Sequence, residues 1–424
     1  MKNSMQAKQE QHIVIVGGGM VGISLALLLS KKLSTTSTRI TLIEQHSLVG
    51  SADVVRSSFD DRSTALSAGT AEIFQHIGCW SPIKSHATAI SQVHVSDKGH
   101  FSGVQLNSKD YSLPALGYVV ENKKLGSVLV NLLNDSGVHC LAPATVNHCL
   151  AKKSGYELQV EIKKKSAKVD CLQENQQEKI DADLVLIADG ADSPIRSSLG
   201  IGVDKKDYQQ SALIANIALA EDHGGVAYER FTNEGPIAVL PLSSLDNVHR
   251  AALVWTLPQG KFDGIAKASE QELIALLQQR FGFRAGKITG IGERHVYPLQ
   301  LIKAQEQVRS HLVVVGNAAH FLHPVAGQGF NLALRDCKVL SDCLLEAEQK
   351  GHSLGSYSTL KAYIEQQGLD QDITIGLTDT LVKLFSSSHL PKEILRQLGL
   401  SSLNFLPSAR NQFAQRMMGL NSFL

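Results

Sequence analysis

Three glycines near the N-terminus have the spacing of a turn that can hold a pyrophosphate. Gly17, Gly19 and Gly22 form the pattern G-x-G-x-x-G. Between a strand and a helix, the first glycine permits a tight turn, the second lets backbone amides approach the phosphates, and the third lets the helix lie close to the sheet. Glu44 follows where a carboxylate can accept hydrogen bonds from ribose hydroxyls. This pattern predicts a bound dinucleotide, with further contacts from Met20, Val21 and Gln45.

The elements that must position this turn are predicted from the pattern of apolar residues. His12–Val16 is a short β-branched run, Met20–Leu33 has helical character, and Arg39–Glu44 is a second strand. Together they form the βαβ unit of a parallel sheet. Residues 13–29 carry no charge, but the glycines in their middle and the lack of a small-residue cleavage site argue against a membrane span or signal sequence. We expect a cytoplasmic protein, with peripheral contact at the inner face of the membrane left open.

Two further glycine-containing loops follow apolar runs that are typical of buried strands. Asp189–Arg196 (DGADSPIR) follows Asp183–Ala188, and Gly316–His320 (GNAAH) follows His311–Val315. The second loop continues as HPVAGQGFN into a helix that we expect to begin at about Asn331. Free amides at that helix start can stabilise negative charge on a bound ring system.

These three segments, in this order, resemble the motifs of the class A flavoprotein aromatic hydroxylases, D-G-x-x-S-x-x-R and G-D-A-A-H included. The resemblance spans most of the chain. It implies bound FAD, transient reduction by NAD(P)H, and dioxygen as co-substrate, with a C4a-hydroperoxyflavin hydroxylating a phenolic ring. It implies FAD contacts from Arg62, Asn122, Asp189, Gly190, Arg196, Gly316, Asn317, Pro324, Gly327, Gly329, Phe330 and Asn331, and it places Pro324, Gly327, Gln328 and Gly329 beside the isoalloxazine.

Two positions depart from the family pattern. Asn317 replaces the usual aspartate that contacts the ribitol, and Asn122 replaces a residue that is basic in many relatives. Arg62 is assigned to the flavin or the nicotinamide, with a structural salt bridge as the alternative. An internal loop ion pair is likewise the alternative for Arg196. His320 and His323 lie in the flavin segment. For both side chains we favour packing or backbone hydrogen bonding over a role as general base.

Shorter motifs resemble the ubiquinone-biosynthesis hydroxylases within this superfamily. They are FDDRSTALS at Phe59–Ser67, VVEN at Val119–Asn122, ERFT at Glu229–Thr232 and HVSDKGH at His94–His100. The resemblance implies a prenylated phenol as substrate and leaves other ubiquinone-biosynthesis proteins open as partners. Two alternatives remain: a flavin-binding, non-catalytic subunit of a biosynthetic complex, or a related hydroxylase acting on another ring position or another aromatic substrate. A halogenase is not favoured because the W-x-W-x-I-P signature is absent.

The order of these segments predicts an α/β (overall α+β) fold with a discontinuous cofactor domain. A Rossmann-like FAD-binding domain would carry an inserted, mainly antiparallel substrate domain and a helical C-terminus. Residues around 60–80 are expected to be helical, and Lys163–Lys179 to form a hairpin-like insert that is a solvated loop. The expected parts are 11–80, 118–206 and 290–365 for the FAD domain, 81–117 and 207–289 for the substrate domain, and 366–424 for the helical region.

The C-terminal stretch Leu403–Leu424 is rich in Phe, Leu and Met with two arginines between them. This composition suits a membrane-surface element, and it equally suits an amphipathic helix docked on the protein, which we favour.

Bulk composition excludes several classes of function. The 424 residues carry 41 basic and 40 acidic side chains and only 5% aromatics, so no nucleic-acid partner is expected. The six cysteines contain no C-x-x-C pair and are expected to be reduced thiols, with no metal site. The oligomeric state is left open, a homo-oligomer included.

Overall fold

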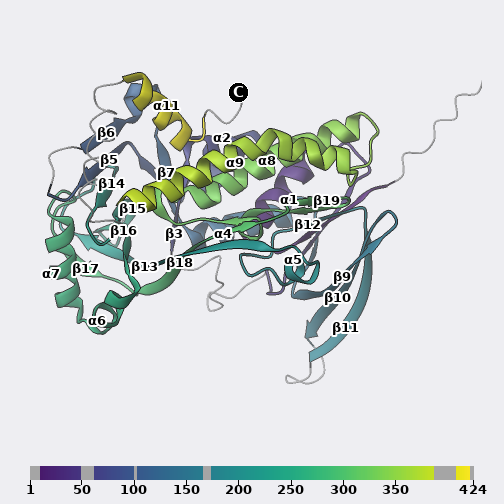
Figure 1. The fold of residues 1–424 in the computed structure, drawn as a ribbon, viewed down its shortest axis with the longest axis horizontal. Helices are drawn as coiled ribbons and strands as arrows, with labels where there is room; N and C mark the ends of the chain where they lie inside the picture. Colours follow the sequence, from purple (N-terminus) through teal and green to yellow (C-terminus); the bar gives the residue numbers. More distant parts are fainter. Residues whose placement is uncertain (1–9, 49–61, 100–102, 166–172, 386–406, 421–424) are drawn as a thin grey trace, which may run out of the picture.

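A six-stranded sheet organises the three glycine segments. The computed structural model describes residues 10–48, 62–99, 103–165, 173–385 and 407–420 (Figure 1). The strand order is β8-β2-β1-β12-β20-β19, parallel except for β19. The strands are β1 (His12–Val16), β2 (Arg39–Ile43), β8 (His139–Leu141), β12 (Leu184–Ile187), β19 (Val308–Arg309) and β20 (Leu312–Val314).

The order in which the chain adds strands to this sheet reverses between β1 and β12. Strands β1, β2 and β8 progress to one side, and the chain then returns to place β12 and β20 on the other. Loops at the carboxyl ends on either side of such a reversal form a crevice where ligands bind. The central strands read as unbroken apolar runs because helices and a second sheet cover both faces. Helix α1 (Met20–Lys32) covers one face together with α4 (Asn122–Asn134).

A nine-stranded sheet forms the other half of the molecule. Its order is β21-β18-β13-β16-β15-β14-β5-β6, with β17 also paired to β13, and it is antiparallel except for the β14–β5 pair. Helices α6 (Phe262–Lys267) and α7 (Glu270–Phe281) cover one face at the end of the molecule (Figure 1). The strands are β5 (Gln92–Asp97), β6 (Gly103–Asn107), β13 (Val203–Leu219), β14 (Val226–Phe231), β15 (Ile237–Leu245), β16 (Val248–Pro258), β17 (Ile288–Ile291), β18 (His295–Ala304) and β21 (His320–Phe321). β18 and β21, which lie in the range 290–365 expected for the FAD domain, join this sheet. The domain boundaries expected from the sequence stay a prediction.

The helix expected over residues 60–80 is partly wrong. Ser63–Ser67 is a strand, β3, which pairs with β7 (Gly117–Glu121), and β7 also pairs with β4 (Ala87–Ile90). Helix α2 (Ala68–His76) begins after Ser67, whose side chain caps the helix by accepting a hydrogen bond from the Thr70 amide. Cross-strand pairing therefore overrides the helical spacing of the apolar residues. α3 (Trp80–Lys84) follows, while Phe59–Asp61 of the FDDRSTALS motif lie outside the described residues.

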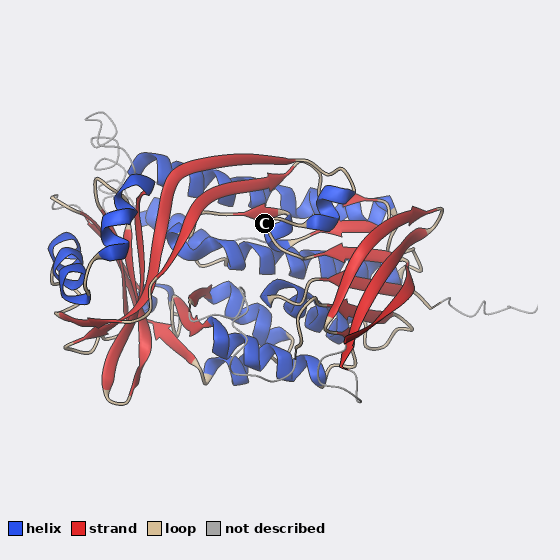
Figure 2. Ribbon diagram, turned by 90° about the horizontal axis from the view of Figure 1, so that it is seen from below, coloured by secondary structure: helices blue, strands red, loops and turns tan. Residues whose placement is uncertain are grey.

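The hairpin-like insert expected at Lys163–Lys179 is regular strand over most of its length and not a solvated loop. Strands β10 (Gly155–Lys165) and β11 (Gln173–Ala182) extend through most of it and pair antiparallel, with β9 (Ala144–Lys152) on the other side of β10. These three long strands stand at one end of the molecule in Figure 2. Buried apolar side chains near the base of β10 anchor the ladder, which then carries its polar residues outward.

Three helices complete the described C-terminal residues, 328–385 and 407–420. α8 (Gln328–Gln349) begins slightly before the expected start at Asn331, and it lies beside α9 (Tyr357–Phe385) along the length of the molecule (Figure 1). α11 (Pro407–Met417) is docked on the protein: Ala414 and Met418 are buried, and the Gly69 amide donates to the Met418 carbonyl at 2.9 Å. No helix in the described part of the chain is long and apolar enough to cross a membrane.

Candidate active site

One cavity of about 1180 Å³ brings the separated glycine segments together. It lies at the carboxyl ends of β1, β2, β12 and β20 and extends to the nine-stranded sheet. Most residues predicted to contact the cofactor line it: Gly17, Gly19, Met20, Val21, Glu44, Gln45, Arg62, Asn122, Asp189, Gly190, Asn317, Pro324, Gly327, Gln328, Gly329, Phe330 and Asn331. Gly22, Gly316 and Arg196 are not among the lining residues.

Gly22 and Gly316 do not line the cavity, but each allows the segments that form it to approach closely. A Cβ on Gly22 would lie 1.9 Å from the Gly17 carbonyl oxygen, so the glycine keeps helix α1 against the turn. Gly316 has a φ of +62°, and a Cβ there would lie 2.9 Å from Cγ1 of Val21. The first turn itself is equally tight, because a Cβ on Gly17 would meet the Ala188 carbonyl oxygen at 2.4 Å. Side chains larger than hydrogen would push the turns apart.

Arg196, the third, joins the second and third loops. Its guanidinium is buried and donates to the carbonyl oxygens of Ala318 at 2.7 Å and Ala191 at 2.9 Å. It therefore fixes the distance between the two loops, whereas the sequence predicted a direct contact with the cofactor.

Acidic side chains stand at two of the strand ends. Glu44 accepts hydrogen bonds from the Gly18 amide at 2.6 Å and the His46 amide at 2.9 Å. Asp189 is different, because both of its carboxylate oxygens are buried without a hydrogen bond of regular geometry. Burial raises the pKa of Asp189, and the nearby Ser193 hydroxyl, backbone amides and Arg196 only partly oppose that rise. A hydroxyl-rich ligand in the cavity would supply the missing donors.

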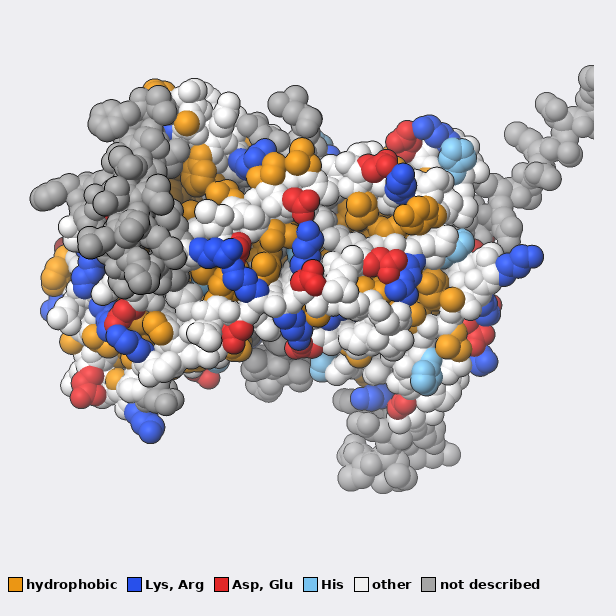
Figure 3. All heavy atoms as spheres, in the orientation of Figure 1, with side chains coloured by type: hydrophobic (Ala, Val, Ile, Leu, Met, Phe, Trp, Pro, Cys, Tyr) orange, Lys and Arg blue, Asp and Glu red, His pale blue; other side chains and the backbone are white. Residues whose placement is uncertain are grey.

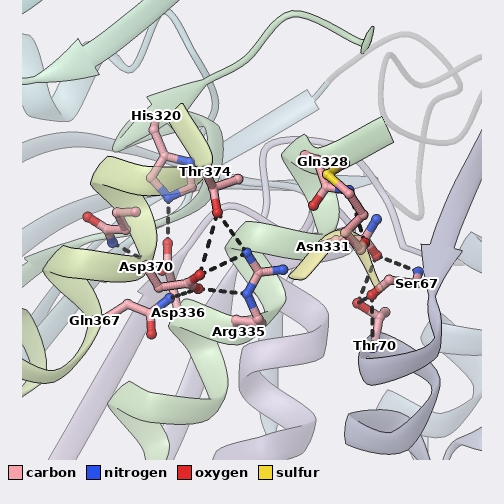
Figure 4. Close-up of polar contacts among 12 residues, drawn as sticks. Ser67, Thr70, His320, Gln328, Asn331, Arg335, Asp336, Gln367, Asp370 and Thr374 are labelled. Atoms are coloured by element: carbon pink, nitrogen blue, oxygen red, sulfur yellow. Dashed lines mark hydrogen bonds and ion pairs between the residues drawn. The ribbon is translucent and has the colours of Figure 1, made fainter. Parts of the chain in front are cut away.

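The start of α8 offers backbone donors to the cavity. Gly327 precedes the helix with φ +60° and ψ 28°, and no side chain caps the first amides. Asn331 holds this helix start in place with a fully used amide group. Its Oδ1 accepts from the Ser67 amide and the Thr70 hydroxyl (Figure 4). Its Nδ2 donates to the carbonyls of Ala65 and Gly327.

A buried polar network lies between α8 and α9, behind the cavity wall (Figure 4). Nε of Arg335 binds the Asp370 carboxylate at 2.7 Å, and a second pair joins Nε2 of His320 to the Asp336 carboxylate.

His323, unlike His320, lines the cavity, and its Nδ1 accepts from the Val325 amide at 3.0 Å. Burial lowers the pKa of His323 to about 4, so this imidazole is neutral at pH 7.

These features fit FAD. The glycine turn at β1 has room for a pyrophosphate, the carboxylates of Glu44 and Asp189 could accept hydrogen bonds from ligand hydroxyls, and the uncapped amides of α8 suit the electron-rich edge of a flavin ring. A family model described as FAD binding domain matches residues 10–372. The chain belongs to this family.

Two curated relatives match this FAD-binding chain over nearly its whole length. Ubiquinone hydroxylase UbiL of Rhodospirillum rubrum is 30% identical, over 96% of this chain and 89% of its own. The 3-demethoxyubiquinol 3-hydroxylase of Escherichia coli is 31% identical, over 97% and 99%. The crystal structure of p-nitrophenol 4-monooxygenase PnpA from Pseudomonas putida shares the fold, with a TM-score of 0.74 at 18% identity over 97% and 99%. The predicted fold class and the resemblance to the flavoprotein aromatic hydroxylases are confirmed.

The chain is therefore an FAD-dependent monooxygenase, with NAD(P)H and dioxygen as co-substrates. The part of its cavity that lies against the nine-stranded sheet was missed by the sequence analysis. This wall includes Tyr297, whose ring lies 4.7 Å from the Arg62 guanidinium carbon, and Glu229. Glu229 belongs to the ERFT motif, which was used only as a sign of resemblance. No spacing rule marked it, because strand residues gather into a wall only once the sheet has formed.

Proposed function

We propose that the chain hydroxylates the aromatic ring of a prenylated phenol in ubiquinone biosynthesis, using NAD(P)H and dioxygen. The observation that carries this proposal is the part of the cavity that lies against the nine-stranded sheet, which we call the apolar chamber. Beyond the glycine turns it is walled by apolar strand residues and by Phe413, Met417 and Met418 of the C-terminal segment. An apolar chamber of this kind suits a ring with an isoprenoid chain. The names of the two relatives point to the same class of substrate.

In this proposal the glycine turn, the start of α8 and the apolar wall have separate roles. Bound FAD, once reduced, supplies the activation of dioxygen. The Gly17 turn and Glu44 hold the dinucleotide end, and the amides at the start of α8 orient the ring system and stabilise negative charge on it. The apolar wall excludes water and keeps the phenol beside the helix start.

Purified holoenzyme tests this function directly. We expect two flavin absorption bands, and oxidation of NAD(P)H that 2-prenylphenol stimulates, with one oxygen atom added to its ring. Phenol without the side chain serves as the control and should bind less tightly. Flavin bands with no stimulation and no product by any prenylated phenol would contradict the proposal and favour a non-catalytic flavin-binding subunit.

The position of hydroxylation is the finer part of the proposal. The motifs quoted above resemble most closely those of 2-polyprenyl-6-methoxyphenol hydroxylase, whereas one relative is named for hydroxylation at position 3 of demethoxyubiquinol. Nuclear magnetic resonance of the isolated product decides between these ring positions.

A further inference from the structure

One acidic residue stands in the apolar floor of the substrate chamber. The registers of five neighbouring strand pairs define a single row of side chains on one face of the nine-stranded sheet. Every member of the row lines the cavity: Val104, Val95, Glu229, Ala238, Val254 and Ile214. On β14 itself, Ala227 and Phe231 point to the same side and also line the cavity. Glu229 is the single ionisable residue among these six.

No group in the described part of the chain binds this carboxyl. Within the described part of the chain, the Glu229 side chain makes no hydrogen bond and no ion pair. Part of its surface faces the cavity, yet protein encloses it, and this burial raises the pKa of Glu229 to about 7. A buried carboxyl left without partners is costly, so its presence here points to a partner that the substrate brings.

The surrounding ionisable groups do not serve this carboxyl. The side chains of His94, Tyr228 and Arg230 point to the opposite face of the sheet, since each of these residues alternates along its strand with cavity-facing residues. His295 extends the row beyond Ile214, four strands away, or about 19 Å at about 4.8 Å per strand. α11 adds only uncharged side chains to the cavity. Burial alone raises the pKa of Glu229, and no charge in the described residues, such as that of Arg62, contributes.

We propose that the Glu229 carboxylate binds the phenolic hydroxyl of the substrate and accepts its proton, a role that rests on the function proposed above. The O–H bond of the phenol breaks, its electron pair stays on the phenolic oxygen, and the proton binds a carboxylate oxygen of Glu229. The negative charge moves from the carboxylate to the ring oxygen, so the total charge in the chamber is unchanged. The ring becomes more electron-rich, which favours its hydroxylation. A phenol near pKa 10 is otherwise almost fully protonated at neutral pH.

Glu229→Gln in the holoenzyme separates proton transfer from binding. The amide oxygen still accepts a hydrogen bond from the phenol, so the Kd for 2-prenylphenol, followed by the change in flavin absorption, should change less than about tenfold. Hydroxylation at pH 7 should fall about 100-fold or more. In the wild type the rate should rise with pH through about 7, whereas in the variant the rise should move up toward the pKa of the phenol. A ring-fluorinated 2-prenylphenol, which ionises at lower pH, should rescue the variant.

The control is Glu293→Gln, which removes an exposed carboxyl outside the cavity and should behave as the wild type. If Glu229→Gln keeps the wild-type rate and pH profile, Glu229 is not the proton acceptor, while the hydroxylase function stands. Loss of binding and turnover together, without rescue by the fluorinated phenol, likewise overturns the assignment in favour of a structural role. If the wild type hydroxylates no prenylated phenol, the proposed function fails, and this role fails with it.

Discussion

At the scale of single residues, the cavity combines satisfied and unsatisfied polar groups. The amide of Asn331 and the carboxylate of Glu44 have backbone partners that hold the loops. Glu229 has no such partner among the described residues, the Asp189 carboxylate makes no hydrogen bond of regular geometry, and burial raises the pKa of both. Perturbed acids in a cavity are typical of functional sites, because unpaired burial lowers stability and is kept only where a ligand uses it.

The stability cost of Glu229 should depend on pH. Its pKa is about 7 when folded against 4.5 as the ordinary value, so below pH 4.5 the carboxyl is protonated in both states and costs nothing. As pH rises from 4.5 to 7 the unfolded state alone ionises, and stability is lost. The free energy of unfolding of Glu229→Gln relative to the wild type should therefore rise by about 2 kcal/mol from about pH 5 to about pH 8. Denaturant unfolding at both pH values measures this gain, and a difference that does not vary with pH would refute it.

At the scale of elements, single polar side chains hold the start of α8 against β3 and α2. Asn331 alone joins α8 to the strand, to the helix cap and to the turn before it. The polar network between α8 and α9 then fixes the far side of the same helix (Figure 4). The amides offered to the flavin are therefore held in position before any ligand binds, which is the property that electrostatic stabilisation requires.

Asn331→Asp tests this anchoring with almost no change of shape. Both donors to the Ala65 and Gly327 carbonyls are lost, so the free energy of unfolding should fall by about 2–4 kcal/mol and flavin should dissociate faster. Denaturant titration and flavin release measure the two effects. The matched control, Asn131→Asp on the exposed side of α4, should change stability by less than about 0.5 kcal/mol. Equal behaviour of the two variants would show that the Asn331 amide does not anchor the helix.

At the scale of the whole molecule, the two sheets and the C-terminal segment enclose one cavity. Acidic and basic side chains are interspersed over the face in Figure 3, as the net charge of +1 suggests. The last described residues close the apolar chamber: the Gln328 side chain donates to the Met417 carbonyl, and the Gly69 amide donates to that of Met418. Of the two interpretations of the C-terminal stretch, the docked helix fits these contacts; Phe405 and Leu406 lie outside the described residues.

Gly69→Ala should release this C-terminal wall. A Cβ at Gly69 would lie 2.3 Å from the Gly419 carbonyl oxygen, while alanine itself favours helix α2. We expect faster proteolysis within 407–420 and more peroxide formed per NAD(P)H, because water enters the opened chamber. Gly368→Ala, at a helical glycine with open space around it, is the control and should leave both unchanged. A Gly69→Ala protein with wild-type proteolysis would show that the wall is not held at this contact.

The sequence by itself determined the cofactor half of this protein. Tight turns depend on local residue type, so Gly17, the βαβ unit and the two later loops could be predicted from short segments. Only the tertiary structure decided that Arg196 joins two loops, that residues 63–67 pair as a strand, and that Glu229 stands in a wall built from five other strands. Such features depend on contacts between residues far apart in the chain, and no local pattern encodes them.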